Sequence, residues 1–209
     1  MPDAESLPQR RYTVEEYFAL EEQSDIRHEY YHGEISPMDE FDLPADMAGS
    51  TKRHNLLVQN CAFALRLGLR GKQRCGVFAE NVRLAVDLGQ HYNYPDVVVS
   101  CDPADDDPRI VHAPTLIIEV LSKSTEARDR GWKFEQYQQL PSLRQYVLVS
   151  QSRLLVDSFL RTKHNTWELT TLRQLTDELP VPAINLRLSL KDIYEEIDTS
   201  PLRLANSVG

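Results

Sequence analysis

Two short apolar runs that each carry one carboxylate decide the fold of this chain: YPDVVV (residues 94–99) and LIIEVL (residues 116–121). Short runs rich in β-branched residues and bounded by Pro and Asp are typical of buried strands. An ionised carboxylate on a buried strand is costly unless it meets a cation, a hydrogen-bond donor or a metal. One such residue can be purely structural. Two of them, Asp96 and Glu119 on successive strands, point to a shared cation.

Length and composition limit the class of protein. The chain has 209 residues, 41% of them hydrophobic and 26% charged, which fits a single folded domain and not a disordered chain. No apolar run approaches the ~20 residues that a membrane-spanning helix needs, and the first residues lack the apolar core of a signal peptide. We therefore expect a cytoplasmic protein without a membrane partner. We also expect one domain at residues 12–198, between a flexible N-terminus (1–11) and a loose tail (199–209).

The three cysteines, Cys61, Cys75 and Cys101, are widely spaced and form no CxxC pair. An odd number of isolated cysteines is better explained by free buried thiols in a reducing compartment than by a disulfide or a zinc site.

The net charge of −9 argues against a protein that coats nucleic acid without specificity, because neutralising phosphates needs a basic face. Carboxylates that hold a metal add negative charge of their own, so a nuclease is not excluded. Any DNA-binding surface must then be local. Basic residues gather along one predicted helix and just after it. Four of them, Arg66, Arg70, Lys72 and Arg74, lie near its C-terminus, where the helix dipole favours cations and explains them without DNA. We expect DNA to contact some of them: Lys52, Arg53, Arg66, Arg70, Lys72 and Arg74.

The remaining elements follow from capping signals, periodicity and turn residues. In chain order the prediction is a short helix after the capping box at 13–16, a hairpin at 27–35, an exposed loop at 39–46, a helix from Ser50 or Thr51 to about Arg70, one or two strands at 76–88, a turn at 89–93, the first carboxylate strand, a loop at 102–108, the second carboxylate strand, a helix from Ser124 or Thr125 to about Leu140, strands at 145–150, 154–160 and 167–172, and a terminal helix at 188–197. This order predicts an α/β (α+β) fold: a mixed central sheet flanked by helices, with an extra N-terminal helix and hairpin and a C-terminal hairpin.

An ordered set of short motifs resembles a known family. The pieces are HEY and GE (28–30, 33–34), His54, YPDVVV (94–99), EVLS (119–122), ST (124–125), DR (129–130), Lys133 and YVLV (146–149). Asp96 followed by Glu119 resembles the PD-(D/E)xK nuclease pattern, and the whole set is similar to the restriction endonuclease family that is abundant in cyanobacteria. The resemblance covers about residues 12–160. Each piece alone is weak, and the ordered set is much stronger.

This resemblance implies a restriction-endonuclease-like core and a Mg²⁺-dependent endonuclease that hydrolyses phosphodiester bonds in DNA. In that reading Asp96, Glu119 and the backbone carbonyl of Val120 hold Mg²⁺, for which Mn²⁺ can substitute, and a lysine orients or activates the water. We also expect a homodimer joined through an edge strand or a terminal hairpin. For each acid taken alone, the alternative is a strand-end residue that caps a loop or pairs with an arginine.

The chain departs from the superfamily pattern at the lysine. The pattern places Lys two residues after the Glu, on the same face of the strand, and Leu121 stands there. Lys123 would keep that face if the strand continued, whereas Lys133 lies on the next helix, like the migrated lysine of related nucleases. We rank Lys133 first. Asp129 and Lys133 are spaced i, i+4, so a plain surface ion pair is the alternative for both.

Three other polar residues are candidates for supporting roles. Glu29 matches a recurrent acid of the family and could reach the metal, although a structural hydrogen bond explains it equally well. His54 could contact substrate or metal, or be a packed bystander. Glu80 could be a third acid. A second function of a different class stays open because of Leu121 and the net charge: a catalytically inactive nuclease-like fold that acts as a binding or regulatory module.

Overall fold

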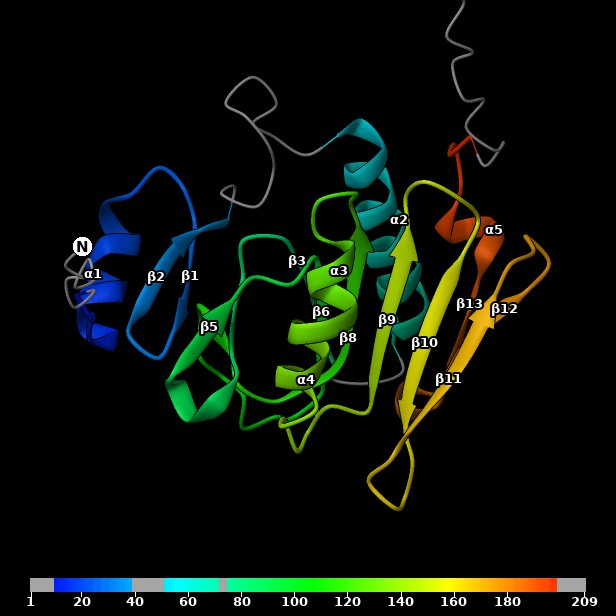
Figure 1. Ribbon diagram of the computed structural model, residues 1–209. Coiled ribbons are helices and arrows are strands. Elements are labelled where there is room, and N and C mark those ends of the chain that lie inside the picture. The colour runs from blue at the N-terminus through cyan, green and yellow to red at the C-terminus, as the bar shows by residue number, and fades with distance from the viewer. Residues whose placement is uncertain (1–9, 39–50, 72–74, 199–209) are drawn as a thin grey trace, which may run out of the picture.

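A mixed six-stranded sheet forms the centre of the fold (Figure 1). The computed structural model describes residues 10–38, 51–71 and 75–198. The strand order is β11-β10-β9-β8-β6-β3, with β8 and β9 parallel and the other neighbours antiparallel. The strands are β3 (Gly76–Ala79), β6 (Val97–Ser100), β8 (Pro114–Leu121), β9 (Gln145–Ser150), β10 (Val156–Arg161) and β11 (Trp167–Leu172). The predicted mixed sheet is confirmed.

Helices cover both faces of this sheet. Helix α2 (Lys52–Leu69) lies on one face, and the other face carries α3 (Glu126–Arg128), a π-helical turn η3 (Asp129–Lys133) and α4 (Phe134–Tyr137). Side chains of β8 alternate between the two layers: Ile118 and Val120 pack in the cluster that contains α2, and Ile117 and Leu121 in the cluster that contains Tyr137 of α4. Glu119 therefore faces the α3–α4 side.

The N-terminal part forms a second sheet with the order β2-β1-β5-β4-β7. Helix α1 (Val14–Gln23) begins at the predicted capping box, in which Thr13 and Glu16 cap each other's backbone N–H. The predicted hairpin is β1 (His28–Tyr31) and β2 (Glu34–Pro37), with Gly33 at a φ of 92° in its turn. The other strands are β5 (His91–Asn93), β4 (Arg83–Ala85) and β7 (Ile110–Val111). Stacked rings of Tyr17, Tyr30 and Tyr92 hold α1 on this sheet.

The C-terminal part confirms one prediction and corrects another. The hairpin β10–β11 turns at 162–166 as predicted. The predicted helix at 188–197 is shorter, because the structure has a second hairpin of β12 (Glu178–Val181) and β13 (Leu186–Ser189), joined by η4 (Pro182–Ile184), before α5 (Leu190–Ile193).

Two further predictions need correction. The segment at 89–93 is not only a turn, since β5 follows the short helix η2 (Asp87–Gly89). The helix predicted from Ser124 or Thr125 to Leu140 is divided by the π-helical turn. Strands of two or three residues such as β5 and β7 are too short for an alternating pattern to identify them.

The prediction of three free thiols is wrong. Cys75 and Cys101 form a disulfide, and only Cys61 is a free, buried cysteine among the described residues. Gly76 of β3 lies opposite Ser100 of β6, so the next residues along, Cys75 and Cys101, also meet, a pairing that sequence spacing does not reveal. The cysteines consequently no longer argue for a reducing compartment.

Several predictions fall on segments outside the described residues: most of the N-terminal segment (1–9), the loop at 39–46, Ser50, Lys72, Arg74 and the tail at 199–209. Within the described parts of the chain, no helix has both the length and the hydropathy to span a bilayer.

Candidate active site

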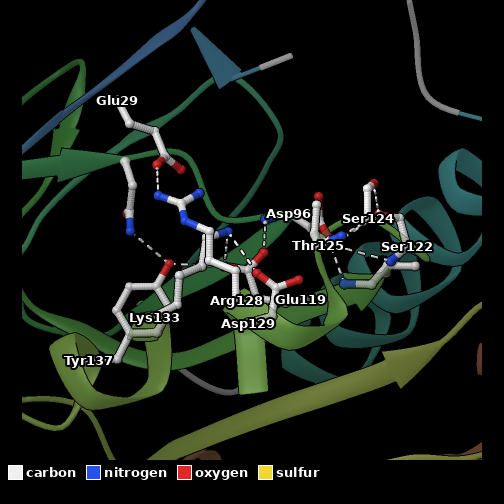
Figure 2. Close-up of polar contacts among 12 residues, drawn as sticks. Glu29, Asp96, Glu119, Ser122, Ser124, Thr125, Arg128, Asp129, Lys133 and Tyr137 are labelled. Carbon is white, nitrogen blue, oxygen red and sulfur yellow. Dashed lines mark hydrogen bonds and ion pairs between the residues drawn. The ribbon is translucent and has the colours of Figure 1, made fainter. Parts of the chain in front are cut away.

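Asp96 and Glu119 lie opposite each other at the ends of adjacent strands. Val97 of β6 pairs with Ile118 of β8 in an antiparallel ladder, so one residue further along Asp96 meets Glu119. The Asp96 Oδ2 accepts a hydrogen bond from the N–H of Val120 at 2.6 Å, and the Glu119 Oε2 accepts one from the N–H of Asp96 at 3.3 Å (Figure 2). Each carboxylate is thus oriented by the backbone of the other strand.

Pro95 explains why the ladder opens here. The N–H of Val120 points toward β6, where Pro95 is the next residue in register. The carbonyl of Val120 faces the same side as its N–H, and Pro95 has no N–H to donate to it. The Pro-Asp pair therefore leaves a carboxylate oxygen of Asp96 and the carbonyl of Val120 on the same side of β8.

Glu119 is the buried centre of a polar network. Its side chain is 3% exposed, and Oε1 accepts hydrogen bonds from Lys133 Nζ at 3.2 Å and from the Tyr137 hydroxyl at 2.9 Å. Asn93 in turn donates to that hydroxyl at 3.0 Å. Burial raises the pKa of Glu119 to about 8, with Lys133 opposing this shift and nearby Asp129 reinforcing it.

Lys133 supplies the positive charge. Its Nζ lies 3.1 Å from Asp129 Oδ1, and both side chains are buried. Burial alone would lower the pKa of Lys133, but Glu119, Asp129 and Glu29 together raise it well above its ordinary value. The lysine is therefore protonated. A surface ion pair, the alternative for Asp129 and Lys133, is ruled out because neither residue is at the surface.

The structure brings Lys133 to Glu119 and does not bring Lys123 there. Lys123 is exposed after the end of β8. Leu121, at the position of the superfamily lysine, packs into the apolar cluster under α4. An apolar side chain therefore occupies that position, and the positive charge beside Glu119 comes from Lys133 in the π-helical turn. Such turns often accompany functional sites.

Two supporting candidates also join the site. Glu29, buried on β1, forms an ion pair with Arg128 of α3. Burial raises the pKa of Glu29, but Lys133 and Arg128 outweigh it and the net shift is downward. His54 Nε2 on α2 lies 3.2 Å from Asp96 Oδ1. Burial lowers the pKa of His54, yet its contact with Asp96 leaves the net pKa raised.

Glu80 contacts the site through its backbone N–H. Its φ is 50°, and its N–H donates to the carbonyl of Asp96 at 3.0 Å. Its carboxylate acts on the site at longer range by helping to raise the pKa of His54.

Sequence reasoning missed Tyr137, Asn93 and Arg128. A signal for Tyr137 was present, because residues 129, 133 and 137 recur every four positions and so share one helical face. Nothing in the sequence connects Asn93 to Tyr137 or Arg128 to Glu29, because each of these contacts joins separate elements.

The oxygen donors at this site fit a hard divalent cation. Among the described residues no group of three or more His, Cys, Asp or Glu side chains is arranged to hold a metal. Mg²⁺ commonly takes only one or two carboxylates and completes its octahedron with water and substrate phosphate. Asp96, Glu119 and the Val120 carbonyl provide that donor set. A cation would also favour the ionised form of Glu119, which burial disfavours.

The described basic residues of α2 lie at both of its ends. Lys52 and Arg53 lie in the first turn beside His54, whereas Arg66 and Arg70 are about 20 Å away at the other end of the helix. Arg66 donates to the carbonyl of Val77 at 3.0 Å. The Lys52 end of α2 is the one next to the candidate site.

Comparison with known proteins assigns the family. Residues 14–191 match the family described as "Putative restriction endonuclease". The chain belongs to this family. Two uncharacterized Synechocystis proteins are similar: slr1290 is 32% identical over 190 residues (90% of this chain, 94% of that protein), and sll1609 is 32% identical over 163 residues (77% and 86%).

A solved structure supports the architecture. It is described as a "putative nuclease belonging to DUF820" from Anabaena variabilis, and it superimposes with a TM-score of 0.67 over 90% of this chain and 99% of that one, at 18% identity. This chain accordingly has the restriction-endonuclease-like α+β fold that the sequence predicted.

Proposed function

We propose that this protein is a Mg²⁺-dependent endonuclease that hydrolyses phosphodiester bonds in DNA, with Mn²⁺ able to replace Mg²⁺. The observation that carries the proposal is a buried, protonated Lys133 that donates to Glu119, which itself meets Asp96 on the adjacent strand. Membership of a restriction endonuclease family supports DNA as the substrate.

Each residue has a role that follows from its contacts. Asp96, Glu119 and the Val120 carbonyl would hold the ion, which supplies Lewis acidity at the phosphate and its attacking water. Tyr137 fixes the carboxylate of Glu119. Lys133 stays protonated, so it does not act as a base. It donates to the attacking water or to a phosphate oxygen and offsets the negative charge that develops there.

A catalytically inactive binding or regulatory module is the second candidate. The observation that favours it is Leu121, which occupies the strand position of the superfamily lysine with a buried apolar side chain. Such a protein would bind a divalent cation, or DNA, without turnover.

The test compares Asp96→Asn and Glu119→Gln with Glu135→Gln, an exposed acid on α4. With supercoiled plasmid and Mg²⁺, we expect the wild type and the Glu135 variant to cleave and the two site variants to lose about a thousandfold or more in rate. Thermal melts should show that Mg²⁺ stabilises the wild type and the control but not the site variants.

Two results would separate the candidates. Stabilisation by Mg²⁺ without cleavage of any DNA favours the binding module. Cleavage that persists in both site variants would show that the proposed residues do not carry the reaction.

A further inference from the structure

A cavity of about 250 Å³ lies next to the candidate site and shares the Glu29–Arg128 pair with it. Three rings, those of Tyr31, His91 and Trp132, line the cavity together with these two charged residues. Trp132 immediately precedes Lys133 in the π-helical turn, so the same turn contributes to the cavity and to the site.

The rings form one compact aromatic wall. The centroid of Trp132 lies 5.1 Å from that of His91 and 5.1 Å from that of Tyr31, and the Arg128 guanidinium lies 4.8 Å from the Trp132 centroid. The wall is assembled from β1, β5 and the π-helical turn, which are far apart in the sequence.

His91 is the polar group on this wall that the fold does not explain. Its side chain is 0% exposed, and neither ring nitrogen has a hydrogen-bond partner among the described residues. Burial lowers its pKa to about 4, so the ring is neutral and offers one donor and one acceptor. Leaving such a group unpaired costs stability. For the stability of the fold alone, an apolar side chain would be more favourable than His91 at this position.

The charges around the cavity exclude an anion as the natural occupant. Glu29 and Glu34 are both lining residues, against a single Arg128 that is already paired with Glu29. A phosphate would meet an excess of negative charge. A neutral ring with amino groups on its edge would instead find carboxylate acceptors.

We propose that this cavity receives a single unstacked nucleobase of the strand whose phosphate lies at Asp96 and Glu119. This inference rests on the proposed nuclease function. The faces of a base would pack on the aromatic wall, and its edge would pair with His91 and the carboxylates, as in other sites that read splayed-out bases. The cavity volume of about 250 Å³ has room for one base.

The first experiment uses Trp132 as the reporter. The chain has two tryptophans, so Trp167→Phe leaves Trp132 alone. This variant is titrated, without Mg²⁺, with two single-stranded oligodeoxynucleotides of equal length, one intact and one composed of abasic residues. We expect the intact strand to quench the fluorescence of Trp132 and the abasic strand, with the same phosphates, to leave it unchanged.

The second experiment perturbs the cavity in two ways. Ser36→Leu fills it from the wall formed by β2, and His91→Leu removes the unpaired nitrogens. Each change should weaken binding of the intact strand about tenfold and leave binding of the abasic strand unchanged. Ser152→Leu, at an exposed serine away from the cavity, is the control. His91→Leu should melt no lower than the wild type, so a folding defect cannot account for its loss of binding.

The outcomes separate this inference from the nuclease proposal. Equal affinity and equal quenching with both strands, in a protein that cleaves plasmid with Mg²⁺, would overturn the base-binding cavity and leave the nuclease proposal standing. Binding of neither strand would overturn the cavity as well, and the plasmid assay then decides separately on cleavage.

Discussion

Two buried glutamates, Glu21 on α1 and Glu119 on β8, have similar exposure, 4% and 3%, and very different surroundings. Glu21 accepts hydrogen bonds from the backbone N–H and the Nδ1 of His28, at 2.9 and 2.8 Å, and from the hydroxyl of Tyr94. Its donors tie α1 to β1 and to the segment just before β6. Glu119 instead lies among other carboxylates, with Lys133 as its cationic partner.

The difference shows how a carboxylate that is fully paired within the fold can be told from a candidate for binding a cation. The acceptors of Glu21 are matched by donors, so its burial contributes to the fold. Around Glu119, both Asp129 and Asp96 raise its pKa in addition to burial. Carboxylates crowded in this way are a cost to stability, and they mark a place where an additional cation is favoured.

The largest effect on stability is expected when two single variants with the same substitution, Glu21→Gln and Glu119→Gln, are compared. Glu21→Gln turns an acceptor into an amide donor facing Tyr94 or His28, and we expect a loss of about 3 kcal/mol in the free energy of unfolding. Glu119→Gln should cost nothing at neutral pH, or should stabilise the protein, because Lys133 keeps Asp129 as its partner. Urea unfolding followed by circular dichroism measures both. Equal losses would remove the distinction between the two glutamates.

The next effect concerns the two lysines. Lys133→Met should lower the rate of Mg²⁺-dependent cleavage about a hundredfold or more, since it removes the charge next to Glu119. Lys123→Met, at an exposed position, should change the rate little. Calorimetric titration with Mg²⁺ checks that both variants still bind the ion. The opposite ranking of the two lysines would assign the role to Lys123.

The sequence predicted the parts of this site that depend on local pattern. The apolar runs around Asp96 and Glu119 identified β6 and β8, and the resemblance to the family ordered them as neighbours. The capping box of α1 and the hairpin turn at Gly33 were also predicted, because each depends on residues only a few positions apart.

Contacts between distant elements could not be predicted. The Cys75–Cys101 disulfide depends on the register of β3 against β6, and the burial of Lys133 depends on how the π-helical turn packs on β8. The spacing of Asp129 and Lys133 fits a surface ion pair equally well. Only tertiary packing shows that the pair is buried beside Glu119.

A smaller effect should appear in the pH dependence of stability. The pKa of Glu119 is raised from 4.5 to about 8, so the folded state retains a proton that the unfolded state has released between these values. The stabilising contribution is complete below pH 4.5 and falls as the pH rises toward 8, by at most about 1.4 kcal/mol per pH unit. Glu119→Gln should lack this slope. Urea titrations of both proteins in EDTA measure it, and a constant difference across the range would contradict the prediction.

The smallest effect is expected at His54, where the crowded acids meet α2. Contact with Asp96 raises the pKa of His54 above 6.5. The stability gained from its protonated form is complete below pH 6.5 and is lost as the pH rises through the folded-state pKa. Asp96→Asn removes the partner charge and should lower the pKa, and Mg²⁺ bound at Asp96 should lower it too, because two cations would then repel each other. Titration of the imidazole by NMR measures both shifts, with the exposed His164 as the reference signal. If Asp96→Asn lowers the pKa and Mg²⁺ does not, His54 and Asp96 form a structural pair and the ion binds elsewhere.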